Sequence, residues 1–132
     1  QKQPLRLLML DLDGFKPIND KHGHSMGDTV LADVAGKIKE VTRDGDICGR
    51  IGGDEFIIIA VSSDHDGADI LAERLRREIG AMRWMPDERG QSIHVGVSIG
   101  VADYPSHART MDALLDYADS AMYLNKRSAR AA

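Results

Sequence analysis

The amino-acid sequence predicts an α+β fold, with a ferredoxin-like βαββαβ core, a mostly antiparallel central sheet, flanking helices and one extra C-terminal helix. This prediction rests on the order in which two kinds of hydrophobic spacing follow one another. Apolar residues recur at strand or helix spacing in the order strand, helix, strand, strand, helix, strand, helix. The chain contains no internal repeat, linker or low-complexity stretch, so its 132 residues are expected to form a single domain.

The first half of the chain supplies a strand, a helix and a hairpin. Residues 5–12 form a continuous apolar run with the length of a strand at the centre of a sheet. Residues 25–41 carry apolar side chains at helical spacing. Residues 47–61 contain two short strand-like segments, ICGRI and EFIIIAV, and Gly52-Gly53 between them predicts a two-residue hairpin turn.

The second half supplies a helix, a strand and a last helix. Residues 66–83 place their apolar side chains on one helical face. From residue 93 to 101, apolar residues alternate with small or polar ones, which is typical of a strand, and Pro105 is expected to end it. The last helix is expected to start near Thr110 and to pack a Met-containing stripe against the core.

The composition restricts the class of function. The chain is 42% hydrophobic and 29% charged, as in an ordinary soluble domain. A net charge of −4 and only 5% aromatic residues argue against a nucleic-acid partner, which usually needs a basic surface and stacking side chains. A small anionic ligand would need a bound cation or a local basic cluster. The single cysteine, Cys48, excludes an internal disulfide and favours a reducing compartment. No apolar run approaches the ~20 residues of a membrane-spanning helix, so we expect a cytoplasmic domain without direct membrane contact.

Asp11-Leu12-Asp13 ends the first apolar strand with two carboxylates. Residues two apart lie on the same face of a strand, so both acids point the same way. Negative charge beside a sheet is costly unless a cation balances it, which makes this segment a candidate cation site. The alternative is a strand that simply leaves the core and enters solvent.

Gly52-Gly53-Asp54-Glu55 lies at the expected hairpin turn. Glycines let a bulky phosphate approach the main chain, and the two acids supply the hard oxygen ligands that magnesium prefers. If the two central strands are neighbours, Asp11 and Glu55 converge on one metal. The alternative is an ordinary hairpin, for which Gly-Gly with any polar flank is sufficient.

The segment from Phe15 to Asp28, FKPINDKHGHSMGD, connects the first strand to the first expected helix. Asn19 and Asp28 offer an amide and a carboxylate, which together can read the donor and acceptor edge of guanine. The alternative is helix capping, because Ser25 and Asp28 also fit a capping box. His22 and His24 match no zinc spacing and are interpreted as loop or packing residues.

Four segments, LDLDGFKPINDKHGHSMGD, RIGGDEF, SIGVADYP and DSAMYLNK, occur in this order and together resemble the GGDEF family of diguanylate cyclases. The resemblance covers nearly the whole chain. It implies a fold like that of polymerase palms and nucleotide cyclases. It also implies the condensation of two GTP molecules into cyclic di-GMP and two pyrophosphates, in bacterial second-messenger signalling. Each domain of this family binds one GTP, so the resemblance implies a two-fold homodimer as the active species.

The resemblance assigns the catalytic and metal-binding roles to residues of the first two segments. Two magnesium (or manganese) ions per active site would be held by Asp11, the carbonyl of Leu12, and Glu55. Asp54 falls where the family has its catalytic acid, acting as a base for the 3′-hydroxyl or as a further metal ligand. The substrate contacts that it implies are the guanine contacts Asn19 and Asp28, the glycines under the phosphates Gly52 and Gly53, the backbone donors Phe15 and Lys16, and the basic pair Lys126 and Arg130.

A further resemblance concerns regulation. Arg43 and Asp46 form an Arg-x-x-Asp motif five residues before Gly52, the spacing of the family's inhibitory site for cyclic di-GMP. Arg74 lies in the region that would supply a second arginine. The alternative is an ordinary charged turn, because Asp44-Gly45 is itself a turn signal.

The family's helix before the first strand is missing from this sequence, so we expect a longer protein with a flanking sensor or output domain. Two other functions remain open. One is a non-catalytic module that binds GTP or cyclic di-GMP and regulates an attached domain, although the intact Gly-Gly-Asp-Glu-Phe argues against it. The other is a different nucleotide cyclase or polymerase palm, against which Asn19 and Asp28 argue.

Overall fold

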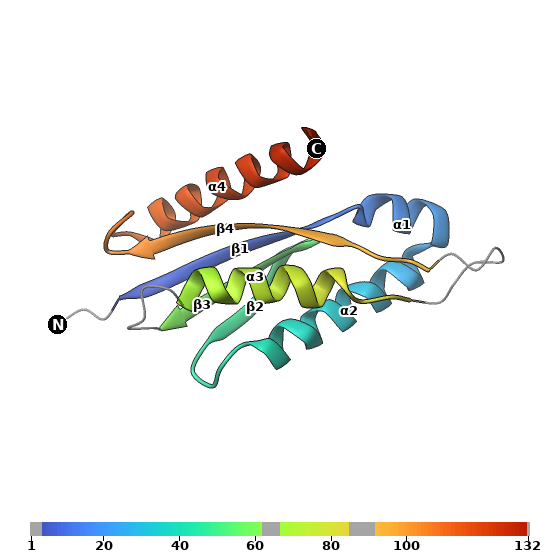
Figure 1. The fold of residues 1–132 in the computed structure, drawn as a ribbon, viewed down its shortest axis with the longest axis horizontal. Helices are drawn as coiled ribbons and strands as arrows, with labels where there is room; N and C mark the ends of the chain where they lie inside the picture. Colours follow the sequence, from blue (N-terminus) through green and yellow to red (C-terminus); the bar gives the residue numbers. More distant parts are fainter. Residues whose placement is uncertain (1–3, 62–66, 85–91, 132) are drawn as a thin grey trace.

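The structure, a computed structural model, describes residues 4–61, 67–84 and 92–131, with side chains for all of these except 67–69 and 127–131. Four strands and four helices follow one another in it (Figure 1). In chain order they are β1 (Leu5–Asp13), α1 (Phe15–His22), α2 (His24–Val41), β2 (Ile47–Gly52), β3 (Glu55–Val61), α3 (Gly67–Gly80), β4 (Gly96–Tyr104) and α4 (Met111–Ala131).

The strands form one sheet in the order β2-β3-β1-β4, and every neighbouring pair is antiparallel. With one helix segment between β1 and β2 and another between β3 and β4, this is the expected βαββαβ arrangement. The predicted α+β fold is therefore confirmed. The apolar run of β1 lies at the centre of the sheet, where both of its faces are covered.

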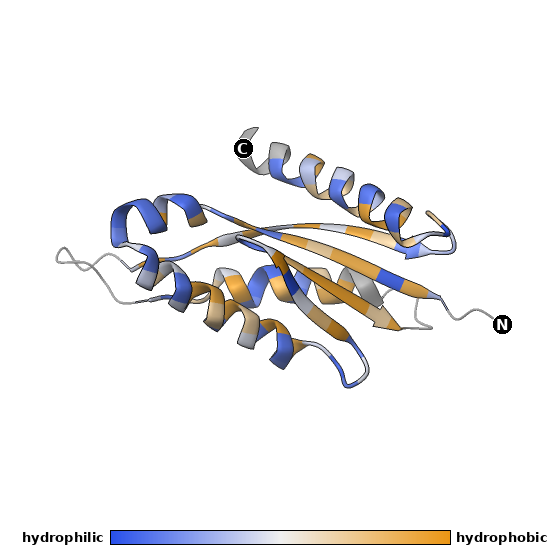
Figure 2. Ribbon diagram, turned by 180° about the vertical axis from the view of Figure 1, so that it is seen from behind, coloured by the Kyte–Doolittle hydropathy of each residue, from blue (hydrophilic) through white to orange (hydrophobic). Residues whose placement is uncertain are grey.

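Two hydrophobic clusters cover the opposite faces of this sheet. Leu8, Leu10 and Leu12 of β1 belong to the larger cluster, together with side chains from α1, α2 and α3. Leu7 and Met9 belong to the smaller cluster, which α4 completes. Figure 1 shows α4 on one side of the sheet and α2 and α3 on the other, and Figure 2 shows the central strands as predominantly hydrophobic.

Helix α4 lies unusually close to β4 at Gly100. A Cβ atom added to Gly100 would lie 1.9 Å from the carbonyl oxygen of Ala118 and 2.4 Å from the amide nitrogen of Met122. Only glycine permits this approach of helix backbone to strand backbone. The contact fixes where α4 crosses the sheet, and Lys126 lies one helical turn beyond Met122.

Three expectations about local structure need correction. Residues 15–22 form helix α1 rather than a loop. The hairpin turns at Gly53-Asp54, because Gly52 still pairs with Glu55 after a bulge that follows Arg50. Strand β4 begins at residue 96, whereas Ile93 makes only an isolated bridge with Trp84.

Within the described part of the chain, α4 covers only the half of its sheet face that β4 and β1 form. Helix α4 packs on β4 and β1, whereas Ile47 of β2 and Val61 of β3 are 64% and 50% exposed. None of the described helices combines the length and the apolar character needed to cross a membrane.

Candidate functional site

The carboxyl end of β1 brings three acidic residues together beside α4. Asp11 and Asp13 alternate with Leu10 and Leu12, so they point to the face that α4 covers. Asp11 lies directly opposite Glu55 of β3 in the antiparallel register. The condition for Asp11 and Glu55 to converge, that their strands are neighbours, is therefore met.

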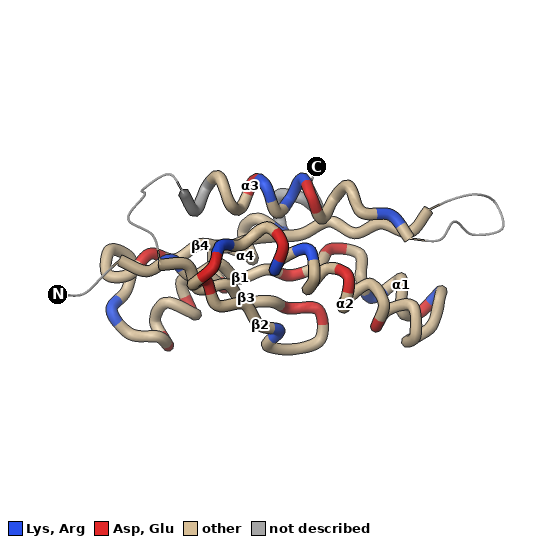
Figure 3. The backbone as a smooth tube through the Cα atoms, turned by 90° about the horizontal axis from the view of Figure 1, so that it is seen from below, with Lys and Arg blue, Asp and Glu red and all other residues tan. Residues whose placement is uncertain are grey.

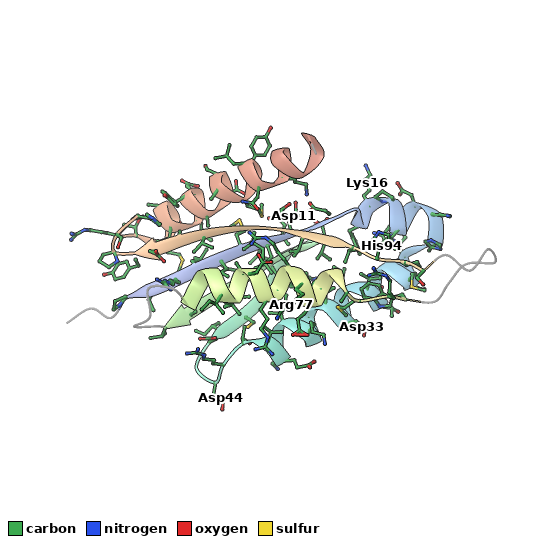
Figure 4. The ribbon with its side chains drawn as sticks, viewed as in Figure 1. Asp11, Lys16, Asp33, Asp44, Arg77 and His94 are labelled. Carbon is green, nitrogen blue, oxygen red and sulfur yellow. The ribbon has the colours of Figure 1, made fainter. Side chains whose placement is uncertain are left out.

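Lys126 of α4 reaches down to this group of carboxylates. Its Nζ donates to Oδ2 of Asp11 at 2.5 Å and lies 3.4 Å from Oδ1 of Asp13. The side chains of Lys126 and Asp11 are only 21% and 16% exposed, so solvent screens their attraction weakly. Figure 4 shows Asp11 between the sheet and the C-terminal half of α4.

Ser98 of β4 completes the contacts of Asp13. Its hydroxyl donates to Oδ2 of Asp13 at 2.8 Å, and Ser98 itself lies opposite Asp11 in the sheet. Ser98 is buried, so this hydrogen bond holds the Asp13 carboxylate in one orientation. Ser98 is not among the site residues that the sequence motifs predict. The strand-like alternation of residues 93–101 already places it on the polar side of an apolar strand.

The pKa of the Asp54 carboxyl depends on its burial and on the neighbouring Asp11. Burial raises the pKa of Asp54 above its ordinary value of 3.8, and the negative charge of Asp11 and a side-chain hydrogen bond with it raise this pKa further. A backbone hydrogen bond and the charge of Lys126 act in the opposite direction without cancelling the effect. The backbone connects the same two segments, because the amide of Leu12 donates to the carbonyl of Asp54 at 3.2 Å.

The pKa of Lys126 is also displaced. Burial alone would lower it, but the hydrogen bond and charge of Asp11, followed by those of Asp13, raise it above 10.5. Lys126 therefore carries its positive charge throughout the physiological pH range. It is the cation that balances the acidic strand end.

The oxygen donors at this strand end fit a divalent cation in their chemistry, because magnesium prefers carboxylate and carbonyl ligands. Oδ1 of Asp11 is buried without a hydrogen-bond partner, and Asp11 repels Asp54. A cation would relieve both costs. Within residues 4–61, 67–84 and 92–131, no three acidic, histidine or cysteine side chains are grouped closely enough to form a complete metal site. Asp11, Asp54 and Glu55 are the acidic residues from which such a site would be built.

A cavity of about 420 Å³ opens beside this group of charges. Asp54 and Lys126 line it on one side, and the start of α1 lines it on the other, through residues 14–17. Gly14 has φ of 82°, a left-handed conformation that suits glycine, and leads directly into the first turn of α1. Phe15 is buried while Lys16 is exposed, and both residues line the cavity.

The hairpin glycines Gly52 and Gly53 are both exposed. Neither has a positive φ, and nothing lies within 4 Å of a Cβ added to either. The carbonyl of Gly53 accepts a hydrogen bond from Nη1 of Arg50 at 3.2 Å. The folded chain itself therefore does not require glycine at these two positions.

Asn19 and Asp28 both lie near the junction of α1 and α2. Asn19 is half-buried on α1, and its side chain lies against Gly27, the residue before Asp28. Asp28 is exposed and lines a second cavity of about 500 Å³ between α2 and β2, which Leu31 and Phe56 also line. The Asn19 side chain is thus next to the residue that precedes Asp28.

The candidate inhibitory residues lie elsewhere. The amide of Arg43 donates to Oδ2 of Asp46 at 3.0 Å, and the amide of Asp46 donates to the carbonyl of Arg43 at 3.1 Å. These two bonds close a turn around Gly45, whose φ is 97°. Arg74 is exposed on α3 and pairs with Glu78 on the same helix at 3.3 Å. Figure 4 shows Asp44 at the tip of this turn, away from Asp11.

Two further observations concern charge. Arg130 lies on α4 one turn beyond Lys126, but its side chain is outside the described residues. Figure 3 shows acidic and basic residues interspersed along α2 and α3 rather than gathered into one basic surface. Positive charge reaches the candidate site through Lys126 and Lys16, which both line the cavity.

The chain is similar to known proteins over its whole length. The family model described as "Diguanylate cyclase, GGDEF domain" matches residues 1–132. Diguanylate cyclase A of Treponema denticola is 39% identical over 130 residues, which are 98% of this chain and 34% of that protein. Diguanylate cyclase TpbB of Pseudomonas aeruginosa is 41% identical over 131 residues, 98% of this chain and 29% of that protein. The chain therefore spans about a third of the length of these relatives.

Solved structures are similar over almost the whole chain. The GGDEF domain of TpbB from Pseudomonas aeruginosa has a TM-score of 0.86 and 38% identity, covering 96% of this chain and 78% of that one. The active GGEEF domain of a diguanylate cyclase from Vibrio cholerae has a TM-score of 0.84 and 33% identity, covering 96% and 78%. The GGDEF domain of DgcB from Caulobacter crescentus, solved in complex with c-di-GMP, has a TM-score of 0.85 and 29% identity, covering 96% and 74%.

Proposed function

Because this chain belongs to the GGDEF domain family of diguanylate cyclases, we propose that it condenses two GTP molecules into cyclic di-GMP and two pyrophosphates. The observation that supports this most directly is the opposition of Asp11 and Glu55 beside a cavity that Lys126 and the start of α1 line. Acidic ligands next to a basic side chain and backbone amides suit a triphosphate with its counter-ions.

The triphosphate would lie in the cavity of about 420 Å³. Lys126, and Arg130 one turn further along α4, would contact its phosphates as cations. The backbone amides of Phe15 and Lys16 would donate to phosphate oxygens, as free amides at the start of a helix do. Gly52 and Gly53 leave open space above the hairpin, and a side chain there would obstruct a phosphate.

Two magnesium or manganese ions would be held by Asp11, the carbonyl of Leu12, Asp54 and Glu55, where they would neutralise phosphate charge and acidify the attacking hydroxyl. In the reaction, the 3′-oxygen of one GTP forms a bond to the α-phosphorus of the other. The bond from that phosphorus to the bridging oxygen of pyrophosphate breaks. Alternatively, Asp54 would not hold a metal ion but would act as the base that accepts the proton of the 3′-hydroxyl.

Guanine would be read by Asn19 and Asp28, which combine a donor and an acceptor at the junction of α1 and α2. Each chain would hold only one GTP. Two chains must therefore face each other for the condensation, which makes a two-fold homodimer the active species.

We further propose that the product regulates the enzyme. Arg43, Asp46 and Arg74 would bind cyclic di-GMP away from the hairpin, since arginine forms bidentate contacts with phosphate and with guanine. The complex of the related DgcB domain with c-di-GMP supports binding of this ligand within the family. The greater length of the relatives supports a flanking sensor or output domain, and the single cysteine, which favours a reducing compartment, supports a cytoplasmic position for this domain.

The test is an incubation of the protein with GTP and magnesium, followed by chromatography of the nucleotides. We expect cyclic di-GMP and two equivalents of pyrophosphate, and neither product when EDTA is present. A non-catalytic module would instead bind GTP or cyclic di-GMP without turnover. That result, with folded protein at a concentration that permits dimers, would refute the proposed activity.

A further inference from the structure

The backbone ties Asn19 of α1 to Gly27 of α2 through Gly23. The carbonyl of Asn19 accepts the amide of Gly23 at 2.9 Å, and the carbonyl of Gly23 accepts the amide of Gly27 at 3.2 Å. Gly23 has φ of 91°, so the chain turns sharply between the two helices at this point. Asn19 and Gly27 therefore face each other across the turn in a fixed relation.

The side chain of Asn19 lies directly on Gly27. A Cβ atom added to Gly27 would lie 1.7 Å from Oδ1 and 2.8 Å from Cγ of Asn19, and 3.3 Å from Cζ of Phe15. Oδ1 of Asn19 is buried and has no hydrogen-bond partner. The carboxamide thus rests against the bare α-carbon of Gly27, with its oxygen end inward.

We infer that Gly27 is a positioning residue that orients the Asn19 carboxamide and thereby sets the preference for GTP over ATP. This inference rests on the proposed function. With Oδ1 packed against Gly27, the donor Nδ2 lies at the other end of the carboxamide, and Asp28, the next residue on α2, supplies an acceptor. A donor beside an acceptor matches the O6 and N1–H of guanine. Adenine has the opposite pattern, because its N6–H₂ donates where O6 of guanine accepts and its N1 accepts where N1–H of guanine donates.

Any side chain at position 27 would need the space that Asn19 occupies. The atom it would meet first is the end of a flexible side chain, so the carboxamide would turn away while the helices keep their places. Alanine also favours a helix more than glycine does, which protects the fold of the variant. We therefore expect Gly27→Ala to displace the Asn19 carboxamide without unfolding the protein.

The experiment measures binding of the α,β-methylene analogues of GTP and ATP by calorimetry, because these analogues cannot release pyrophosphate. Contacts to the triphosphate and to magnesium are common to both analogues and cancel in the affinity ratio. We expect Gly27→Ala to lower the GTP-to-ATP ratio by about tenfold or more, as the loss of a polar base contact does. Gly36→Ala is the matched control, because Gly36 lies on the same helix with nothing within 4 Å of an added Cβ.

Two further measurements separate positioning from general damage. The chain has only two asparagines, Asn19 and Asn125, so the side-chain amide signals in a nuclear magnetic resonance spectrum are few. Gly27→Ala should shift the Asn19 signals and leave those of Asn125 in place. In an Asn19→Ala background, Gly27→Ala should change the affinity ratio by less than about twofold, because the group it displaces is gone.

The outcomes distinguish the inference from the proposed function. Equal affinity of the wild type for the two analogues would overturn both this inference and the proposed reading of guanine by Asn19 and Asp28. A wild type that prefers the GTP analogue, with an unchanged ratio or unshifted Asn19 signals in Gly27→Ala, would overturn the inference alone. An equal loss of preference in the Asn19→Ala background would also overturn it, because Gly27 would then act without Asn19.

Discussion

The ammonium group of Lys126 lies 2.5 Å from a carboxylate oxygen of Asp11, although the two residues are 115 positions apart in the sequence. The contact joins the last helix to the central strand at the point where the strand ends. Because Asp13 is also within 3.4 Å, one lysine balances two acids. The same lysine lines the cavity in which we place the triphosphate, so it has two possible anionic partners.

The first prediction concerns this lysine. Lys126→Met leaves Asp11 and Asp13 without their counter-ion, so in EDTA it should lower the free energy of unfolding by about 1–3 kcal/mol. Manganese should restore part of this loss and should bind the nucleotide-free variant more tightly than the wild type. Urea titrations and calorimetry measure both effects. Lys37→Met is the control, because Lys37 pairs with the exposed Glu40 at 3.4 Å. Equal stability of Lys126→Met and Lys37→Met would contradict the role of Lys126.

The second prediction concerns pH. The pKa of Asp54 is raised in the folded state, first by burial and then by Asp11, so folding resists its ionisation. The folded protein therefore loses stability as the pH rises from the ordinary value of 3.8 through the raised pKa. Asp54→Asn removes this cost and should stabilise the metal-free protein at about pH 7 by roughly 0.5–1 kcal/mol, a range that allows for solvent screening.

The gain from Asp54→Asn should disappear at a pH below the ordinary pKa, where the wild-type carboxyl is protonated in both states. Urea unfolding in EDTA at several pH values provides the measurement. Asp119→Asn, at an exposed position on α4, is the control variant. A wild type that is the more stable protein at neutral pH in EDTA would argue against repulsion between Asp11 and Asp54.

The third prediction concerns catalysis. Asp11→Asn should reduce the rate of cyclic di-GMP formation at least ~100-fold, since metal stabilisation of a transferring phosphate supplies several kcal/mol. Initial rates at saturating GTP and magnesium measure the change. Asp119→Asn should retain the wild-type rate. Near-normal turnover by Asp11→Asn would exclude Asp11 from the metal site.

The fourth prediction concerns feedback. Arg43→Ala removes a charged, potentially bidentate contact and should weaken binding of cyclic di-GMP by about 2 kcal/mol, some thirtyfold. Initial rates at low product should barely change. Product-inhibition titrations of wild type, Arg43→Ala and the exposed control Arg109→Ala provide the comparison. Superimposable inhibition curves would make the segment from Arg43 to Asp46 an ordinary surface turn.

The fold could be predicted because strand and helix spacing differ over long segments, whereas short or irregular ones mislead. Helix α1 has eight residues, including Pro17, which is too short for a periodic signal. The buried Ile93 and Val95 continue the alternation of β4, yet they precede its ladder, because alternation reports burial rather than strand pairing. Gly52-Gly53 predicted a hairpin, but the bulge after Arg50 moved the turn by one residue.

The site was predictable only where its residues are near in sequence or follow from the strand order. Asp11 opposite Glu55 follows once β1 and β3 are neighbours. The ion pair of Lys126 with Asp11 depends on where α4 crosses the sheet, which the close contact of Gly100 with Ala118 fixes. Local patterns contain no information about that crossing. For the same reason, the contact of Gly27 with Asn19 emerges only from the angle between α1 and α2.

The alternation of faces along β1 has a consequence for insertions and deletions. Its even-numbered leucines are anchored in the larger cluster, while Asp11 and Asp13 belong to the other face. Adding or removing one residue within β1 would rotate both acids into the apolar core and leave Lys126 facing leucine. A two-residue change would preserve the faces but shift the acids by roughly 7 Å along the sheet, past Glu55 and Ser98. The length of this strand is therefore expected to tolerate no change at all.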